Sequence, residues 1–488
     1  MERIGVFLCH CGLLGPIDIQ RVLEAIGEKP GVIYAAPHQD MCTDPALALV
    51  KNTIKDEKLD RVVLTSCCPS LHGKVFRAAL ASIGLASHQL EIADLRAQDG
   101  SKDASERIIE VINSSVERLR TSLPTITAKV PITKRALVIG GGIAGIQAAL
   151  DIADGGYEVI LVERTSSIGG HMIQLSQTFP SLDYAQCIMT PKMVEIGQHP
   201  NVKLLTYSEV EGVSGEAGNF RVKIKRKEVF VEEHVGAIIV ATGYELLPKG
   251  EIREFEEDPD IIDGLQFERI LSPSGPTGGE VRRPSDGKVP QEVVFISCVG
   301  SRDPEHGLPY CSRVCCMYLV KMAVLYKHAV HDGQAYIFYM DTRATGKGYE
   351  EFLNRAVEEK GVLYLRGRVS KVFRDGDKIK VWGIDTLTGK RVEISCDLVV
   401  LAMAMIARPD AKELARKLGI ATDEYGFMAE IHPKLRPLES AVPGIYIAGT
   451  AQGAKDIPDT VAQASGAASK VLALFFKDEL ILERAATS

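Results

Sequence analysis

The sequence predicts an α/β protein in which a small α/β domain precedes a dinucleotide-binding core that is split in two along the chain. Three observations predict this fold class. A glycine turn follows a short apolar strand at residues 136–145, a second apolar strand ends in Ala-Thr-Gly at 241–243, and a third ends in Ala-Gly-Thr at 448–450. With 488 residues, 45% of them hydrophobic, the chain is long enough to bury roughly two or three separate cores.

The glycine turn after residues 136–139 predicts dinucleotide binding. Its first glycine permits a tight bend, its second lets the backbone approach a pyrophosphate, and its third allows the following helix to pack closely against the strand. The phosphates would lie at the N-terminus of that helix, where free amides collect. The predicted contacts at the turn are Gly140, Gly142, Ile143, Ala144 and Gly145.

A second strand, at 158–162, ends at Glu163 and is followed by Arg164. An acid at this distance from the glycine turn is placed to accept hydrogen bonds from a ribose. Three further segments resemble those that line FAD in two-dinucleotide flavoproteins, namely the glycine pair at 169–170, the Ala-Thr-Gly turn, and the strand at 444–450. The predicted contacts of FAD beyond the glycine turn are Glu163, Arg164, Gly169, Gly170, His171, Met172, Val210, Ala241, Thr242, Gly243, Gly449, Thr450, Lys455, Asp456 and Ile457.

Lys455 is the predicted catalytic residue. In the same superfamily its position faces the isoalloxazine, and a cation there would stabilise reduced, anionic FAD and raise its potential. The alternative is that Lys455 only closes a loop. Much of the superfamily has an acid after the last glycine of this region, whereas this chain has Thr450, so we expect the ribityl contact to come from a hydroxyl, a backbone amide or Asp456.

Composition argues against several classes of partner. The formal net charge is −7 and no extended run of lysine and arginine is present, so we do not expect the chain to bind nucleic acid. The longest apolar runs, such as 398–407, are about half the ~20 residues that span a bilayer. The first residues lack the long apolar stretch of a secretion signal, which predicts a cytoplasmic protein.

A group of four cysteines predicts a metal centre beside the flavin. They are Cys298, Cys311, Cys315 and Cys316, the last two opening an apolar helix. Cys311 and Cys315 would share a helix face if the helix starts early enough. Four thiolates suit an iron–sulfur cluster. Zinc and inert buried thiols are the alternatives, although zinc more often binds paired C-x₂₋₄-C knuckles.

The N-terminal 125 residues predict a second cluster. Strands at 4–8, 32–36 and 61–65 are each followed by cysteine, at the carboxyl edge where open α/β sheets build sites. The spacing matches no ferredoxin run, so buried or redox-active thiols remain an alternative. The predicted ligands are Cys9, Cys11, Cys42 and Cys67, with Cys68 as the alternative to Cys67, and His10 and His72 are expected to be structural.

Four segments together resemble the A subunit of heterodisulfide reductase and its relatives. These segments are residues 298–303, 309–318, 346–351 and 455–460. The resemblance covers nearly the whole chain and implies a cytoplasmic electron-transfer protein with FAD and a [4Fe-4S] cluster on the four cysteines near residue 300. It also implies partners similar to the B and C subunits of heterodisulfide reductase, or other electron-transfer subunits, and a homodimer within a larger complex.

This chain departs from larger members of that family, which carry ferredoxin modules, because it has no C-x₂-C-x₂-C run. It is therefore closer to shortened relatives, including those of quinone-interacting complexes. The alternative function is a stand-alone NAD(P)H-dependent flavoprotein disulfide reductase. That function needs a nicotinamide turn and a C-x-x-C pair, whereas the strand at 292–297 ends in Cys298 without G-x-G-x-x-G.

The expected domains follow from these segments. They are an N-terminal domain at 1–125, a linker at 126–134, an FAD-binding domain at 135–245 and 406–476, an inserted domain at 246–405 and a tail at 477–488. An amphipathic stretch at 471–482 is a candidate docking helix, although a plain surface helix is the favoured expectation. Cys187 is expected to be a packed thiol and Cys396 to lie in a core.

Overall fold

The computed structural model describes residues 2–10, 17–66, 69–95, 104–123, 125–305 and 307–485. The chain forms two compact units. The first comprises residues 1–130 with 432–435 and 481–488, and the second comprises residues 131–431 with 436–480.

The first unit is built on a parallel sheet of strand order β2-β1-β3-β4. Its strands are β1 (Ile4–Cys9), β2 (Val32–His38), β3 (Arg61–Ser66) and β4 (Leu90–Asp94). Helices α1 (Ile19–Gly27), α2 (Asp44–Asp56), α3 (Pro69–Ala81) and α4 (Ala104–Thr121) accompany them. Alternate residues of β1 enter two separate apolar cores, with Val6 in one and Phe7 in the other. The sheet is therefore buried on both faces, as its three predicted apolar strands require; β4 was not predicted.

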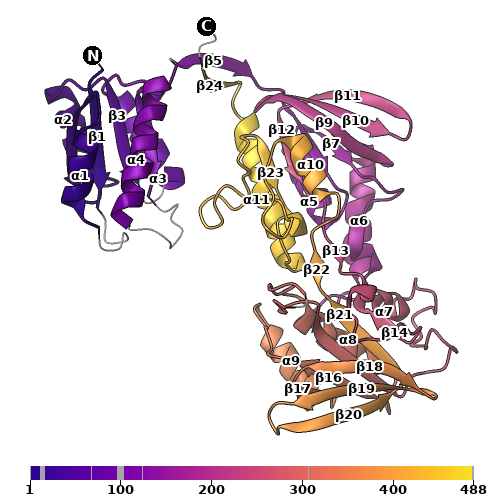
Figure 1. Ribbon diagram of the computed structural model, residues 1–488. Coiled ribbons are helices and arrows are strands. Elements are labelled where there is room, and N and C mark those ends of the chain that lie inside the picture. The colour runs from indigo at the N-terminus through magenta and orange to yellow at the C-terminus, as the bar shows by residue number, and fades with distance from the viewer. Residues whose placement is uncertain are drawn as a thin grey trace. The chain divides into compact units, whose positions relative to one another are not determined.

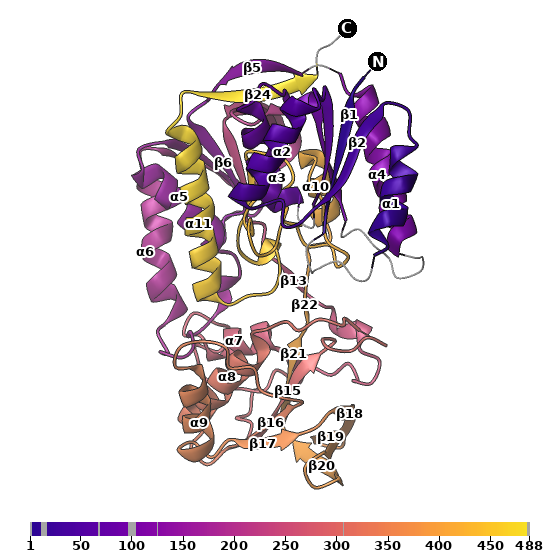
Figure 2. The same cartoon turned by 90° about the vertical axis from the view of Figure 1, so that its left-hand side faces the viewer.

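Two terminal segments differ from expectation. The segment expected as a linker contains strand β5 (Thr125–Pro131), and it pairs with β24 (Glu479–Ala485), which lies beside it in Figure 2. The expectation of a helix over the whole of 471–482 is wrong. Helix α11 (Ile457–Phe475) ends earlier, and the chain continues into β24. The apolar run Leu480-Ile481-Leu482 can form a strand once β5 offers an edge to pair with.

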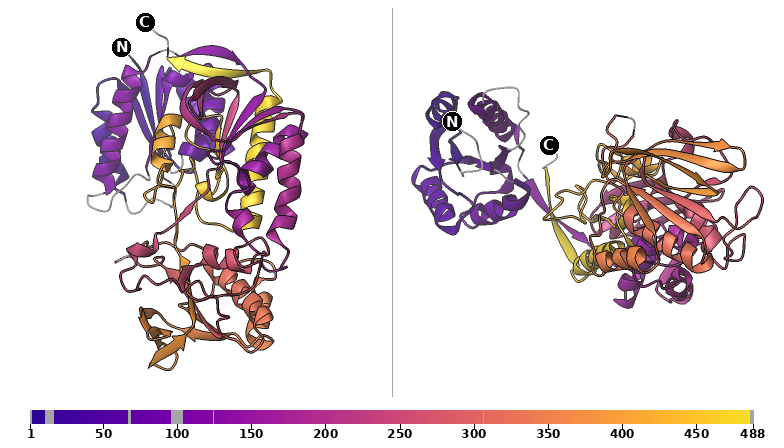
Figure 3. Two further views of the ribbon diagram at one scale, coloured as in Figure 1. Left: turned by 90° about the vertical axis from the view of Figure 1, so that its right-hand side faces the viewer. Right: turned by 90° about the horizontal axis from the view of Figure 1, so that it is seen from below.

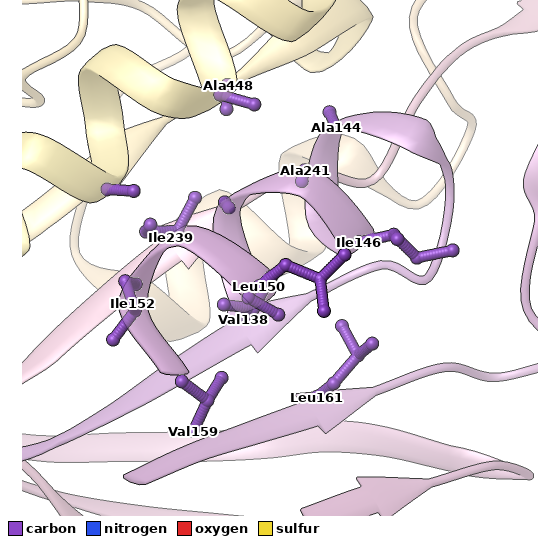
Figure 4. Packing of buried hydrophobic residues seen from close by; sticks show 14 of the residues in the cluster. Val138, Ala144, Ile146, Leu150, Ile152, Val159, Leu161, Ile239, Ala241 and Ala448 are labelled. Atoms are coloured by element: carbon purple, nitrogen blue, oxygen red, sulfur yellow. The ribbon is translucent and has the colours of Figure 1, made fainter. Parts of the chain in front are cut away.

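The second unit contains the dinucleotide-binding sheet, whose strand order is β23-β12-β6-β7-β8. The strands are β6 (Arg135–Ile139), β7 (Glu158–Val162), β8 (Val202–Leu205), β12 (Ala237–Val240) and β23 (Ile445–Ile447). Helices α5 (Ile143–Asp154), α6 (Ala185–Gln198) and α11 share one apolar core with this sheet, and α10 (Ala411–Leu418) packs into the core on the other face (Figure 1). Figure 4 shows Ile146 and Leu150 of α5 against Val138 and Leu161 of the strands.

An antiparallel sheet of β9 (Ser208–Glu216), β10 (Asn219–Arg226) and β11 (Val229–Val235) completes this domain. The short strands β13 (Glu245–Leu246) and β22 (Met405–Ile406) pair where the chain leaves for the inserted domain and returns from it. One sheet therefore joins strands from two separated parts of the chain, since β23 pairs with β12.

The inserted domain has a parallel sheet of its own, ordered β14-β21-β15-β16-β17. Its strands are β14 (Ile261–Asp263), β15 (Glu292–Val299), β16 (Gln334–Tyr339), β17 (Leu363–Arg366) and β21 (Leu398–Met403). Helices α7 (Gly264–Leu271), α8 (Cys315–Ala329) and α9 (Tyr349–Glu358) share a core with one face. The antiparallel strands β18 (Val369–Asp375), β19 (Lys378–Asp385) and β20 (Lys390–Cys396) cover the other face, as Figure 3 allows the reader to follow. The inserted domain thus adds a second dinucleotide-type sheet to this unit.

Short turns of 3-10 helix complete the assignment of the described residues, namely η1 (Ser87–Gln89), η2 (Gly170–Gln174), η3 (Lys249–Glu251) and η4 (Gly449–Ala451). Both η2 and η4 belong to segments expected to contact FAD. The glycines at 169 and 449 have positive φ angles of 116° and 68°, which only glycine adopts readily. These two glycines therefore shape the backbone around the expected FAD site.

Candidate flavin and cysteine site

A cavity of about 710 Å³ runs from the glycine turn of the flavin-type domain to helices α7 and α8 of the inserted domain. This volume lies within the usual range of cofactor sites. Most predicted FAD contacts line it: Gly140, Gly142, Ile143, Ala144, Glu163, Arg164, Gly170, His171, Met172, Ala241, Thr242, Gly243, Thr450, Lys455, Asp456 and Ile457. Val210 lines a smaller adjoining cavity that also touches Gly140 and Glu163.

The glycine turn is as tight as the sequence predicted. Gly140 has a φ of 106°, and a Cβ atom there would overlap the carbonyl oxygen of Ala241. A Cβ atom on Gly145 would overlap the carbonyl oxygen of Gly140. By contrast, a Cβ on Gly142 would meet only the Cα of Gly170, at 4.0 Å, so this backbone is left open to the cavity. The turn can therefore receive a pyrophosphate at its amides.

Glu163 is held in place at the end of β7. One carboxylate oxygen accepts a hydrogen bond from the amide of Gly141 at 2.8 Å, and the other accepts from the amide and the hydroxyl of Thr165, each at 2.8 Å. Each carboxylate oxygen can accept further bonds, because an ionised carboxylate offers about four acceptor positions. The side chain is thus oriented to accept from a ribose.

Lys455 is buried and engaged with its own loop. Its Nζ donates to the carbonyl oxygens of Gly449 and Gly453, both at 2.7 Å, and to Oε1 of Gln452 at 3.0 Å. Burial lowers the pKa of Lys455 to about 8, with a smaller contribution from the cation of Arg313. These three hydrogen bonds are those of a residue that closes a loop. Lys455 also lines the cavity, so both of its expected roles stay open.

Asp456 is also engaged, since its carboxylate caps α11 through the amide of Asp459 and accepts a hydrogen bond from the hydroxyl of Tyr349 at 2.8 Å. Thr450, by contrast, lines the cavity in the part that the sequence reserved for the ribityl chain. Asp456 thus already accepts hydrogen bonds from the protein, which leaves Thr450 as the better candidate of the two side chains for the ribityl contact.

A buried ion pair in the cavity wall was missed from sequence. Lys321 of α8 and Glu268 of α7 form it, with side chains 2% and 1% exposed. Glu268 accepts hydrogen bonds from the amide and hydroxyl of Ser176, and Lys321 donates to the carbonyl oxygen of Gln177 at 2.8 Å. The pair therefore ties the inserted domain to the flavin-type domain. The only sequence signal was a lysine within an apolar helix.

Two aromatic groups of the cavity wall were likewise missed. The ring of Tyr244 stacks on His171 with centroids 4.3 Å apart, and burial lowers the pKa of His171, so a neutral imidazole is favoured there. Tyr318, on α8, lines the cavity from the inserted domain. Burial raises the pKa of both tyrosines, which therefore stay protonated.

Three of the four cysteines near residue 300 come together. Cys298 is the last residue but one of β15 and has a positive φ of 59°, and Cys315 and Cys316 open α8. Hydrogen bonding with Cys315 lowers the pKa of Cys298 and lowers that of Cys316 to about 6, whereas the pKa of the buried Cys315 is raised by the same bonds. The thiols of this group therefore contact one another at the carboxyl edge of the second sheet.

Cys311 lies outside the helix. Because α8 begins at Cys315, the expectation that Cys311 and Cys315 share a helix face is wrong. Cys311 instead lies in the preceding loop, where its sulfur accepts a hydrogen bond from the amide of Arg313 at 3.3 Å. The hydroxyl of Tyr310 donates to the carbonyl oxygen of Met405, and that of Ser312 accepts from the amide of Met405, so both anchor this loop.

The donor chemistry around the cysteines fits a group bound by thiolates. Arg302 donates to the sulfur of Cys298 and is fixed by two bonds to Asp341 of 2.6 and 2.8 Å. A cation and a helix N-terminus both favour thiolate. The thiols nevertheless form hydrogen bonds with one another. Within the described ranges no group of three or more His, Cys, Asp or Glu side chains is arranged as an ion site.

The other cysteines divide into three cases. Cys9 is buried at the end of β1 and Cys42 is exposed, whereas Cys11, Cys67 and Cys68 lie outside the described residues. Cys396 is buried in a core, as predicted. Cys187 is exposed on α6, so the prediction of a packed thiol is wrong. This helix is only weakly amphipathic, so its sequence does not show which face is exposed.

Comparison with known proteins decides the family. A family model described as FAD dependent oxidoreductase matches residues 136–227. The iron-sulfur A subunit of the CoB–CoM heterodisulfide reductase of Methanocaldococcus jannaschii is 40% identical to this chain over 557 aligned residues, covering 96% of this chain and 85% of the relative. The chain belongs to the family of heterodisulfide reductase A subunits. It is a flavin-dependent oxidoreductase.

Other members of the heterodisulfide reductase A-subunit family match equally widely. The A subunit of the H(2):CoB-CoM heterodisulfide,ferredoxin reductase of Methanothermobacter thermautotrophicus is 38% identical over 99% of this chain and 86% of its own length. A protein of Archaeoglobus profundus described as similar to the A subunit is 36% identical over 99% and 87%. Among solved structures, thioredoxin reductase of T. acidophilum is similar, with a TM-score of 0.49 and 16% identity over 71% of this chain and all of that one.

No helix in the part of the chain that the structure describes combines the length and the apolar character that a membrane-spanning helix needs.

Proposed function

We propose that this member of the heterodisulfide reductase A-subunit family passes electrons between FAD in the 710 Å³ cavity and a [4Fe-4S] cluster held by Cys298, Cys311, Cys315 and Cys316. FAD takes electrons in pairs, and a four-iron cluster takes them singly. A second cluster in the N-terminal unit, on Cys9, Cys11, Cys42 and either Cys67 or Cys68, extends the route to partner subunits. The chain acts as a homodimer in a complex with proteins similar to the B and C subunits of heterodisulfide reductase, in the cytoplasm.

One observation carries this proposal. Helix α8 begins with Cys315 and Cys316, and the same segment forms part of the cavity wall through Val314, Tyr318 and Lys321. Val314, next to Cys315, and Tyr318, about one turn further along α8, therefore both line the flavin site. This continuity gives electrons a short path through one packed helix.

The chain's own residues divide the work. The glycine turn and Glu163 bind the nucleotide end of FAD, while Lys455 and Lys321 place cations in the wall of the cavity. A nearby cation favours a reduced flavin because that form carries negative charge. Tyr244, Tyr318 and the methionines at 403 and 405 present apolar surface that keeps water from the site.

The alternative, an NAD(P)H-dependent disulfide reductase, receives less support. In the second sheet Cys298 lies at the end region of β15 and Arg302 in the turn after it, where a nicotinamide nucleotide would need a glycine turn. Cys187 has Tyr184 at the position three residues earlier, so it forms no C-x-x-C pair.

An anaerobic reductive titration tests the proposal. Wild-type protein should take up about three electrons per FAD with one cluster, or about four with two, since the flavin accepts about two and each cluster about one. Cys311→Ala should lower the count by about one. Cys396→Ala, which removes a buried thiol distant from the site, is the matched control and should leave the count unchanged. A wild-type count of about two per FAD contradicts the proposal.

A further inference from the structure

A buried hydroxyl on β17 of the inserted domain has no hydrogen-bond partner among the described residues. The Oη atom of Tyr364 is buried, and among the residues that the structure describes none forms a hydrogen bond with it. Buried phenol hydroxyls nearly always find a partner, because an unpaired polar group in the interior is unfavourable. A group that the chain itself does not supply would therefore satisfy this hydroxyl.

Strand pairing directs Tyr364 toward the cysteines. Tyr364 lies on β17 directly beside Ile337 of β16, and paired residues of parallel strands point to the same face of a sheet. Ile337 belongs to the apolar core between this sheet and α8, which also contains Cys298 and Cys315. Tyr364 packs against the same core. Its side chain is therefore on the α8 face and not on the β18–β20 face.

Tyr364 and the sulfur of Cys316 both contact residues 339–341, at the carboxyl end of β16. The ring of Tyr364 meets Tyr339 edge-on, with centroids 5.3 Å apart, which fixes its orientation. The sulfur of Cys316 itself donates to the carbonyl oxygen of Asp341, at 3.7 Å, just beyond β16.

We propose that Tyr364 donates a hydrogen bond to the iron–sulfur cluster at Cys316 and thereby raises the reduction potential of that cluster. The inference rests on the proposed function, since it needs a cluster on these cysteines. A donor facing a sulfur stabilises the reduced form, which carries one more negative charge. Arg302, which donates to Cys298, supplies a second donor to the group. Tyr364 acts through this hydrogen bond and is not a ligand of the cluster.

The test is an anaerobic potentiometric titration of the full chain, followed by electron paramagnetic resonance of the reduced cluster. Tyr364→Phe removes only the hydroxyl, so the cluster should be retained while its midpoint potential becomes more negative. A tenfold change in the ratio of reduced to oxidised cluster corresponds to about 59 mV for a one-electron couple. Tyr336→Phe on β16, whose hydroxyl bonds to Glu292, is the matched control and should leave the potential unchanged.

A second measurement does not depend on the folding of the variant. Electron–nuclear double resonance of reduced wild-type protein should show a proton near the cluster that exchanges in deuterated buffer. Absence of that proton, or an unchanged cluster potential in Tyr364→Phe, overturns the assignment of Tyr364 and leaves the proposed function standing. Absence of any cluster signal in wild-type protein overturns the proposed function itself, so the two failures are distinguishable.

Discussion

A Gly145→Ala variant should purify with clearly less FAD per chain than the wild type. The added Cβ would overlap the carbonyl oxygen of Gly140 and lie 3.3 Å from a methyl carbon of Val138. Relief requires α5 to move away from β6, which displaces the turn at Gly140 that the pyrophosphate must approach. Forced overpacking of this kind costs about 1–3 kcal/mol, and we expect FAD affinity to fall by more than about tenfold.

The matched control for this variant is Gly197→Ala. Gly197 lies on α6, and no atom comes within 4 Å of a Cβ built there. Alanine should stabilise that helix by about 0.5–1 kcal/mol, because glycine loses more backbone freedom on folding. FAD per chain and thermal unfolding are measured for both variants. Full FAD occupancy in Gly145→Ala would show that this turn does not bind the cofactor.

Lys321→Met should destabilise the second unit by about 3–5 kcal/mol, the usual effect of removing one partner of a buried ion pair. The substitution leaves the carboxylate of Glu268, 1% exposed, with only the bonds from Ser176. Urea unfolding, followed by flavin and tyrosine fluorescence, measures the loss.

A double variant separates charge from packing. Lys321→Met with Glu268→Gln removes both charges, so it should recover a large part of the lost stability because no unpaired charge remains. Lys380→Met breaks an exposed pair with Glu393 and should change stability little. A loss in Lys321→Met no greater than in Lys380→Met would contradict the role given to the buried pair.

Local signals made the flavin-type domain predictable. Gly140, Glu163 and the Ala-Thr-Gly turn each carry a backbone or charge requirement within a few residues, so sequence spacing fixes their relative positions. The structure accordingly brings most of the predicted contacts to one cavity. Cys315 and Cys316 were equally predictable, because adjacent cysteines at a helix start need no long-range information.

Contacts between distant segments could not be predicted in the same way. Lys321 and Glu268 are 53 residues apart, and only the packing of α7 on α8 makes them partners. Tyr364 reaches the cysteine group through the register of β17 on β16, which no single segment specifies. The pairing of β5 with β24 joins segments that are far apart along the chain, so each alone resembled a linker or a helix.

The measurement that tests the central claim most directly is the content of iron, acid-labile sulfide and FAD in anaerobically purified protein, wild type against Cys311→Ala. We expect about eight irons per FAD in the wild type and about four in the variant, because each cluster carries about four. About four irons, lost entirely in Cys311→Ala, would confirm the cluster beside the flavin and leave the N-terminal cysteines as thiols. FAD without iron would contradict the account.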